Sequence, residues 1–367
     1  MNQAPLPISA FSASITKKDL SSMLKFIGTV TKLANDENYQ AQLITELPIT
    51  GQHPLNHYAV MMAYDFHLSA LGPKLIEINT NAGGLWFAYR CYVQQAKQFE
   101  GRFAQRLLNT FLTDYALFKQ TTTAKPSTLV ILDEQPKTQF LYPEMTLFVA
   151  LFQQAGITAL IADPSQLYLK DDGLYIDNQR VDMIYNRHCD FYLTTPSMCH
   201  IKDAWLQNTV CLSPNPRIYG LLADKRRMIL WSNPQQLAHF QLTLAERQLF
   251  ADIIPKTQLL SELSLENAWL TRKQWVFKPT IGFGSQGVYV GHKLTKTKLN
   301  NLPPEHTLIQ QWIPPSVSYN ENNLAFKTDI RLFVYHQHPL AITARLYQGQ
   351  VTNMHTPHGG FAKVVIT

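Results

Sequence analysis

The chain has 367 residues, 46% of them hydrophobic and 16% charged, so it can bury a large core and we expect two or three packed lobes. No stretch approaches the apolar length of a membrane span, and the N-terminus lacks a basic segment followed by a continuous apolar run, so neither a membrane protein nor a secretory signal is expected. The net charge of +6 comes without basic runs interleaved with aromatic residues, which argues against nucleic-acid binding.

The first sixty residues are expected to be helical, and a strand pair and an amphipathic stretch are expected to follow. A helix is predicted at residues 17–34, a pair of strands around residues 64–79, and a long amphipathic stretch from about Phe87 to Gln120. The polar segment TTTAKPS, residues 121–127, is the best candidate for a domain boundary. A first region therefore spans residues 1–120.

Strands and helices alternate beyond this boundary. The expected elements are a buried strand at 128–134, an apolar helix at 145–156, a strand at 157–164, a hairpin at 167–177 and a strand at 181–187. This alternation predicts a small parallel α/β domain over residues 125–215. The glycine-rich first turn of dinucleotide-binding domains is missing, so a Rossmann-like scaffold without NAD is the preferred interpretation.

Residues 64–79 predict a hairpin that brings three polar side chains together. Folding the chain about Leu71 sets Asp65 opposite Glu77, and strand periodicity places both on one face with Asn79. The opposite face is expected in the core and carries Tyr64, Phe66, Leu68, Ile76 and Ile78. Two facing carboxylates repel each other unless a cation lies between them, which fits an oxygen-coordinated Mg²⁺. The alternative is an exposed hairpin whose acids are merely solvated.

A second motif lies at residues 275–288, with sequence WVFKPTIGFGSQGV. An apolar strand delivers Lys278, and the loop that follows contains Gly282, Gly284, Ser285 and Gly287. Such glycines allow backbone N–H groups to close over phosphates, while the lysine supplies positive charge. It is not a Walker loop, because the GK[ST] ending is absent and a strand follows. The alternative is a glycine-rich hairpin turn beside a surface lysine.

Two arginines occur on apolar strands further along the chain. Arg331 and Arg345 occupy positions where an arginine is seldom found without a partner. A phosphate or carboxylate ligand is the functional possibility, and a buried aspartate such as Asp329 or Asp65 is the alternative. Before them, the strand at 308–315 ends in two prolines, which suits a hinge between lobes.

The four cysteines are too few and too scattered for a disulfide framework, which favours a reducing, cytoplasmic location. Cys189 and Cys199 each adjoin a histidine, but the ten-residue gap between them fits none of the usual zinc spacings. The sequence therefore predicts no zinc site.

In this order the segments resemble the ATP-grasp superfamily, whose members use ATP to activate a carboxylate as an acyl phosphate and then join it to a nucleophile. The resemblance covers most of the chain from about Asp224, plus residues 64–84. It implies that Lys225, in ADKRR, and Lys278 reach the nucleotide phosphates and that the glycine loop is the phosphate flap. The implied adenine hinge consists of Gln310, Gln311, Trp312 and Ile313. The acid usual at this hinge is replaced by glutamine, which affects purine selectivity.

The resemblance also implies the residues beside the transferred phosphate. Arg345, aided by Arg331, would neutralise charge on the γ-phosphoryl group. Asn353 and the Gly359-Gly360 pair resemble the rest of an Arg-x-Asn-x-Gly-Gly element, although the gap from arginine to asparagine is longer here.

The closing element of an ATP-grasp fold is an Asp followed about a dozen residues later by Glu-x-Asn, which together hold magnesium. Here it is matched by Asp65 and the run Glu77-Ile78-Asn79 near the start of the chain. The sequence therefore resembles a circularly permuted ATP-grasp protein, with the segment AKVVIT, residues 362–367, expected beside the N-terminal hairpin.

The resemblance implies an α/β fold in four regions. Residues 1–120 would supply helices and the permuted metal-binding strands, 125–215 the Rossmann-like substrate domain, 216–305 the small lobe, and 306–367 the rest of the large lobe. At the end of a strand in the substrate domain, Asn186 and Arg187 are candidate substrate residues. Arg187 would clamp a carboxylate, and its alternative is pairing with Asp182 or Asp190.

The implied activity is that of an ADP-forming ligase that requires ATP and Mg²⁺, with two metal ions expected. It would join a small-molecule or peptide carboxylate to an amine, forming a C–N bond, or to a thiol. The alternative is a non-catalytic module that binds or senses ATP on the same scaffold.

Overall fold

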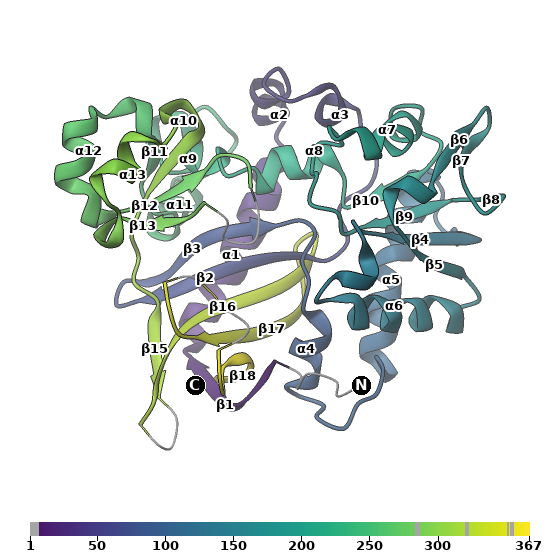
Figure 1. The fold of residues 1–367 in the computed structure, drawn as a ribbon, viewed down its shortest axis with the longest axis horizontal. Helices are drawn as coiled ribbons and strands as arrows, with labels where there is room; N and C mark the ends of the chain where they lie inside the picture. The colour runs from purple at the N-terminus through teal and green to yellow at the C-terminus, as the bar shows by residue number, and fades with distance from the viewer. Residues whose placement is uncertain (1–6, 283–286, 320–322, 351, 353–355) are drawn as a thin grey trace.

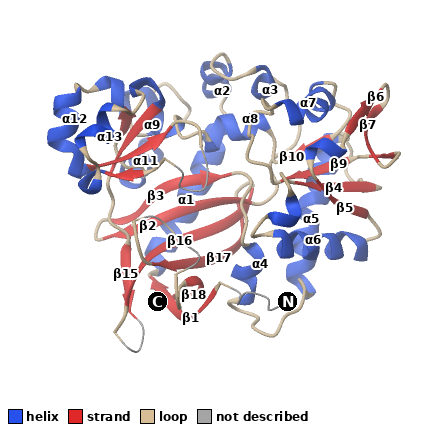
Figure 2. Cartoon of the chain, viewed as in Figure 1, coloured by secondary structure: helices blue, strands red, loops and turns tan. Residues whose placement is uncertain are grey.

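The computed structural model describes residues 7–282, 287–319, 323–350, 352 and 356–367. Within these ranges the chain forms a mixed α/β fold with one seven-stranded, two four-stranded and one three-stranded sheet (Figures 1 and 2). The large sheet lies below and between two smaller bodies, one at the upper left of the view and one at the right. No helix in the described part of the chain is long and apolar enough to cross a membrane.

The large sheet is built from both ends of the chain. Its order is β1-β18-β17-β16-β2-β3, and β15 pairs with β16 outside this path. The strands are β1 (Ile8–Ile15), β2 (Met62–Ser69), β3 (Gly72–Asn79), β15 (Ser316–Tyr319), β16 (Ala325–Tyr335), β17 (His338–Tyr347) and β18 (Gly360–Ile366). β1 runs parallel to β18, and β2 runs antiparallel to β16. The segment AKVVIT therefore shares a sheet with the N-terminal hairpin, but β17 and β16 separate the two.

One face of this sheet packs against helix α1 (Lys17–Ala34), which forms where it was predicted. Thr16 caps the helix by accepting a hydrogen bond from the N–H of Asp19. Helical periodicity directs Phe26 and Ile27 into the core, where they join Tyr64, Phe66 and other apolar side chains of the sheet. The prediction that the start of the chain is helical was wrong for residues 8–15, which form β1.

A β-bulge sets the register of the β2–β3 hairpin. Ser69 pairs with Gly72 across a two-residue turn, and the pairing shifts by one residue between Phe66 and Asp65. The shift places Glu77 opposite Asp65, as predicted. It also turns Leu75 into the core in place of Ile76, so the prediction that Ile76 packs the core was wrong.

The body at the right contains the predicted parallel sheet, in the order β10-β9-β4-β5. Its strands are β4 (Thr128–Leu132), β5 (Thr158–Ala162), β9 (Met183–Asn186) and β10 (Cys211–Ser213). Helices α5 (Gly101–Phe118) and α6 (Tyr142–Gln154) cover one face and α7 (Cys199–Leu206) the other. The three-stranded sheet beside it comprises β6 (Tyr168–Lys170), β7 (Gly173–Ile176) and β8 (Gln179–Arg180).

The amphipathic stretch expected from Phe87 to Gln120 is two helices, α4 (Leu85–Arg90) and α5. Gly101 begins α5 with φ +56°, a left-handed conformation that interrupts a continuous helix. Short helices α2 (Glu37–Ile44) and α3 (Ile49–Gln52) complete the first 120 residues.

The body at the upper left is a four-stranded antiparallel sheet covered by short helices. Its order is β11-β14-β12-β13. The strands are β11 (Thr257–Leu259), β12 (Trp275–Pro279), β13 (Tyr289–Val290) and β14 (Thr307–Gln311). The helices of this body are α9 (Arg227–Trp231), α10 (Pro234–Leu237), α11 (Leu244–Ile253), α12 (Leu265–Thr271) and α13 (Lys296–Asn300). The short helix α8 (Pro216–Ile218) precedes them and packs beside α3.

The turn between β3 and α4 is closely packed around two glycines. At Gly83, an added Cβ would lie 2.6 Å from Nη2 of Arg187. At Gly84, it would lie 2.2 Å from the buried ring of Phe361, and the backbone has φ +93°. Only glycine fits both the space and the backbone conformation at position 84.

We expect Gly84→Ala to lower the free energy of unfolding by about 2–5 kcal/mol, because left-handed strain adds to overpacking. Gly101→Ala is the matched control, since its added Cβ meets nothing within 4 Å and it suffers the backbone strain alone. Gly28→Ala, inside α1 with open space around it, should instead raise the free energy of unfolding by about 0.5–1 kcal/mol. Urea denaturation measures all three, and equal losses at Gly84 and Gly101 would contradict the packing argument.

Candidate functional site

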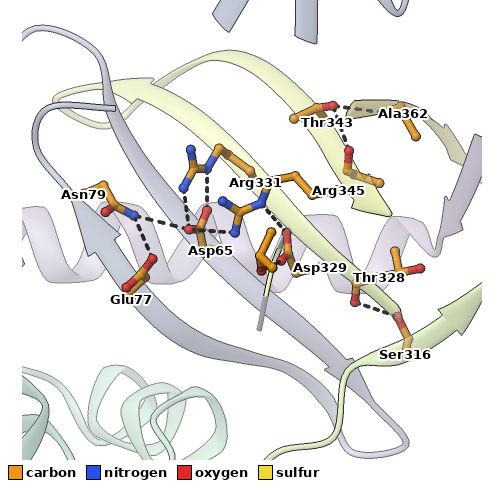
Figure 3. A network of polar contacts seen from close by, with 12 residues as sticks. Asp65, Glu77, Asn79, Ser316, Thr328, Asp329, Arg331, Thr343, Arg345 and Ala362 are labelled. Atoms are coloured by element: carbon orange, nitrogen blue, oxygen red, sulfur yellow. Dashed lines mark hydrogen bonds and ion pairs between the residues drawn. The ribbon is translucent and has the colours of Figure 1, made fainter. Parts of the chain in front are cut away.

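Charged side chains form a row across one face of the large sheet (Figure 3). Glu77 of β3 faces Asp65 of β2, and Asp65 faces Arg331 of β16. Arg345 of β17 faces Asp329 of β16. Residues two apart on a strand share a face, so Asp329 and Arg331 point to the same side. The sheet thus brings together residues from the two ends of the sequence.

Both arginines pair with buried aspartates, which is the alternative considered from the sequence. Nε and Nη2 of Arg331 donate to the two oxygens of Asp65 at 2.7 and 2.6 Å. Nη2 of Arg345 lies 2.9 Å from Oδ2 of Asp65, and its Nε donates to Oδ1 of Asp329 at 2.6 Å. Burial alone would raise the pKa of Asp65, but the two guanidinium groups hold it below its ordinary value.

The three residues predicted to hold a metal lie in contact. Nδ2 of Asn79 donates to Oδ2 of Asp65 at 3.2 Å and to Oε1 of Glu77 at 3.4 Å. In the described parts of the chain, Glu77 has no ion pair with an arginine or lysine, and no three His, Cys, Asp or Glu side chains are grouped to hold a metal. Glu77 is therefore the carboxylate left available to a ligand.

A cleft separates this face of the large sheet from the antiparallel sheet above it. Lys278 of β12 and Lys225 both line the cleft, as does Glu77. Nζ of Lys278 donates to Oε1 of Gln310 at 2.7 Å and to the carbonyl oxygen of Ile76 at 3.1 Å. Burial lowers the pKa of Lys278 from 10.5 to about 8, against the opposing effect of Glu77.

The glycine loop approaches the other lysine. Nζ of Lys225 donates to the carbonyl oxygen of Gly282, where the backbone has φ +152°. Gly287, at the far end of the loop, has φ +70°. Gly284 and Ser285 lie outside the described residues. The two lysines thus line the same cleft.

The predicted hinge passes along the edge of the cleft. Gln310, Gln311, Trp312 and Ile313 all line it, but the side chain of Gln310 is turned toward Lys278. The carbonyl oxygen of Ile313 lies 2.8 Å from Nδ1 of His67, which must carry the proton because a carbonyl only accepts. Burial lowers the pKa of His67.

Sequence reasoning missed His67 and Asp329 as members of the site. His67 lies two residues from Asp65 on the same strand, so periodicity could have placed it on the cleft face. Asp329 was considered only as a partner for an arginine. The structure shows it 2% exposed, lining the cleft and accepting a hydrogen bond from Thr352 at 2.8 Å.

Comparison with solved structures identifies the architecture. No family model matches the sequence, and no curated protein matches it either. A glutathione synthetase-like effector from Globodera pallida, in its apo form, is similar with a TM-score of 0.60 and 11% identity, over 98% of this chain and 90% of the other. A protein provisionally assigned as a γ-glutamylcysteine synthetase from Methylobacillus flagellatus is similar with a TM-score of 0.55 and 9% identity, over 96% and 90%. The chain has an ATP-grasp-like fold.

A second cavity of the ATP-grasp-like fold lies at the carboxyl ends of β4 and β9, where open α/β sheets bind ligands. Its volume is about 530 Å³, and its lining includes Asn79, Asp133 and Arg187. Burial raises the pKa of Asp133. The cavity therefore borders the candidate metal residues and contains both signs of charge.

Arg187 has a partner that the sequence did not indicate. Its Nη1 lies 3.3 Å from Oε1 of Glu144 and also donates to the hydroxyl of Tyr185 at 3.1 Å. The expected alternatives, Asp182 and Asp190, instead accept hydrogen bonds from backbone N–H groups of Ser127 and Thr128 and of Thr195. Glu144 lies in the first turn of α6, where an acid is ordinary, so no local signal marked it.

The remaining predicted substrate residues lie apart from this cavity. Asn186 is buried, accepts a hydrogen bond from the N–H of His188 at 3.1 Å and contacts the carbonyl oxygen of Pro214. Gly359 and Gly360 line neither cavity. An added Cβ would lie 2.4 Å from the carbonyl oxygen of Leu346 at the first and 2.2 Å from that of Pro7 at the second, so close backbone packing accounts for both. Asn353 lies outside the described residues.

The buried ammonium of Lys278 makes stability depend on pH. Between pH 8 and 10.5 the unfolded chain keeps a proton on this lysine that the folded protein has lost, so the free energy of unfolding rises with pH through that range. We expect Lys278→Met to be more stable than the wild type at pH 7 and to lose that advantage by about pH 10.

Urea denaturation at pH 7, 8, 9 and 10 measures the difference. Lys32→Met, at a half-exposed surface ion pair with Glu246, is the control and should show no such trend. If the stability difference between Lys278→Met and wild type stays constant with pH, the conclusion that burial lowers the pKa of Lys278 is wrong.

Proposed function

We infer that the protein is an ATP- and Mg²⁺-dependent, ADP-forming ligase that activates a carboxylate as an acyl phosphate and joins it to an amine or thiol. One observation carries this proposal: in an ATP-grasp-like fold, Lys225, Lys278, Arg345 and Glu77 converge on a single cleft. Cations that bind phosphate and a carboxylate available to a metal are the groups that phosphoryl transfer requires.

The two lysines are suited to hold a triphosphate. Each ammonium group now donates to a neutral oxygen of the protein, on Gly282, Ile76 or Gln310. Phosphate oxygens are stronger, charged acceptors for the same donors. The hinge at 310–313 would hold the adenine by its backbone, and closure of the glycine loop would exclude water.

Glu77 and Asn79, with Asp65, are the residues that would hold Mg²⁺. Carboxylate and amide oxygens suit this ion, which usually completes its coordination with phosphates and water. Such an ion would supply positive charge that offsets the negative charge of the nucleotide phosphates. Two ions would be expected here, because phosphoryl-transfer sites commonly use a pair of metal ions.

Arg345 and Arg331 would neutralise the γ-phosphoryl group as it passes to the carboxylate. Arg345 lines the cleft, and Arg331 lies beside it on the neighbouring strand. The second cavity would bind the substrate that carries the nucleophile, and Arg187 would be the cationic group of that cavity. Its border at Asn79 supports this role, because the nucleophile must meet the acyl phosphate there.

The alternative is an ATP-binding module without catalysis. It would use the same lysines and hinge but would need no substrate cavity beside the metal residues. The second cavity therefore favours an enzyme. Release of ADP on addition of mixed amino acids, short peptides or polyamines, measured with a coupled assay, separates the two.

We also propose that the chain is a circular permutant with the four regions expected from the sequence. The strands carrying Asp65 and Glu77 lie in one sheet with β16, β17 and β18, although they precede them in sequence. The parallel pairing of β1 with β18 places the first and the last strand of the described chain side by side in that sheet, which supports the proposal.

Lys225→Ala and Lys278→Ala should each weaken ATP binding and leave the fold intact, because neither lysine has an ion pair among the described residues. Thermal shift with and without MgATP checks this, since a ligand that binds the folded state raises its melting temperature. Lys32→Ala, far from the cleft, is the control. If MgATP raises the melting temperature of both cleft variants as much as that of the wild type, the two lysines do not bind the nucleotide phosphates.

Glu77→Gln should still bind ATP measurably but release ADP at least about a hundredfold more slowly, because it removes charge where charge is redistributed during transfer. Asp65→Asn should slow turnover similarly. Equilibrium ATP binding and ADP release are measured separately on each variant. Turnover of Glu77→Gln at the wild-type rate would show that this carboxylate is not a catalytic metal ligand.

A further inference from the structure

Nitrogen donors crowd one oxygen of the Asp65 carboxylate. Oδ1 accepts from Nε of Arg331, while Oδ2 contacts Nη2 of Arg331, Nη2 of Arg345 and Nδ2 of Asn79 (Figure 3). A metal ion coordinates through oxygen lone pairs, and three nitrogen donors already occupy those of Oδ2. This oxygen, which shares Asn79 with Glu77, therefore cannot serve a metal until a donor leaves.

Glu77 differs from Asp65 although the two face each other across the hairpin. Within the described residues its side chain accepts a single hydrogen bond, the weak one from Nδ2 of Asn79 at 3.4 Å. It also lines the cleft. A divalent cation entering the cleft alone would therefore find one available carboxylate, not two.

Of the two arginines, Arg345 can leave Asp65 at the lower cost. It contacts Asp65 through Nη2 alone, and its Nε stays anchored to Asp329 at 2.6 Å. Arg331, by contrast, grips both oxygens of Asp65 and also donates to the carbonyl oxygen of Gly83 at 3.2 Å. A guanidinium group donates hydrogen bonds to phosphate as readily as to carboxylate. Arg345 can therefore turn to a phosphate while its Nε stays bound to Asp329.

We propose that Asp65 is shared between Arg345 and the metal site, so that a divalent cation binds tightly only after a phosphate ligand has drawn Arg345 away. The inference rests on the proposed function and adds a regulatory coupling to it. Nucleotide and metal then favour each other's binding, and the coupling is reciprocal. In the ligand-free protein the arginine occupies the place of the cation.

The test is titration with Mn²⁺ alone, followed by the electron paramagnetic resonance signal of the free ion, without nucleotide. The wild type should bind Mn²⁺ weakly. Arg345→Gln should bind it at least about tenfold more tightly, since a charge-assisted hydrogen bond no longer competes. Arg226→Gln is the matched control, because it also removes an arginine paired with a buried aspartate, Asp224, but outside this row.

Double variants show which aspartate is responsible for the gain in Mn²⁺ affinity. It should vanish in Arg345→Gln/Asp65→Asn and persist in Arg345→Gln/Asp329→Asn, because both aspartates lose a partner but only Asp65 faces Glu77. Loss of the gain only with Asp329→Asn would overturn the proposal. Circular dichroism and urea denaturation establish beforehand that each variant is folded.

The wild type decides the matter even if Arg345→Gln fails to fold. Tight binding of Mn²⁺ by the wild type without nucleotide would overturn the exchange. If MgATP raises the melting temperature but Arg345→Gln and wild type bind Mn²⁺ equally, the exchange is wrong and the proposed function stands. If neither MgATP nor Mn²⁺ binds to the wild type, the exchange and the proposed function are both wrong.

Discussion

Charges buried on one face of the large sheet have to be paired, and the geometry of the cleft depends on that pairing. Asp65 and Asp329 are only 1% and 2% exposed, and two arginines supply their counter-charges. Removing one partner from such a buried pair costs about 3–5 kcal/mol, so the pairing holds β2, β16 and β17 in register. Glu77, beside this balanced group, keeps its charge available to the cleft.

Hydrogen bonds from buried arginines also hold the turn that lies between the two cavities. Arg331 donates to the carbonyl oxygen of Gly83 at 3.2 Å, and Arg187 donates to that of Ala82 at 3.3 Å. The buried carboxylate of Glu144 accepts the N–H of Gly84 at 3.1 Å. The turn after β3 is thus held from the large sheet on one side and from the parallel sheet on the other. This turn follows directly on Glu77, which lines the cleft, and Asn79, which lines the second cavity.

Several features of the site could be predicted because they are local. Alternation along β2 and β3 placed Asp65, Glu77 and Asn79 on one face, and the structure confirms their contact. Alternating strands and helices predicted the parallel sheet, which is confirmed. The error at Ile76 arose because a β-bulge changes side-chain alternation by one residue, and bulges have no strict sequence signal.

The sequence by itself determined the periodic strands, the glycine-rich loop and the strand-borne cations, since each depends on neighbours a few residues apart. Only the tertiary structure decided which strands are adjacent and which acid each arginine meets. Arg331 and Asp65 are 266 positions apart, and Arg187 and Glu144 are 43 apart. Such partners are chosen by strand order and by the need to neutralise buried charge, and both are properties of the assembled sheet.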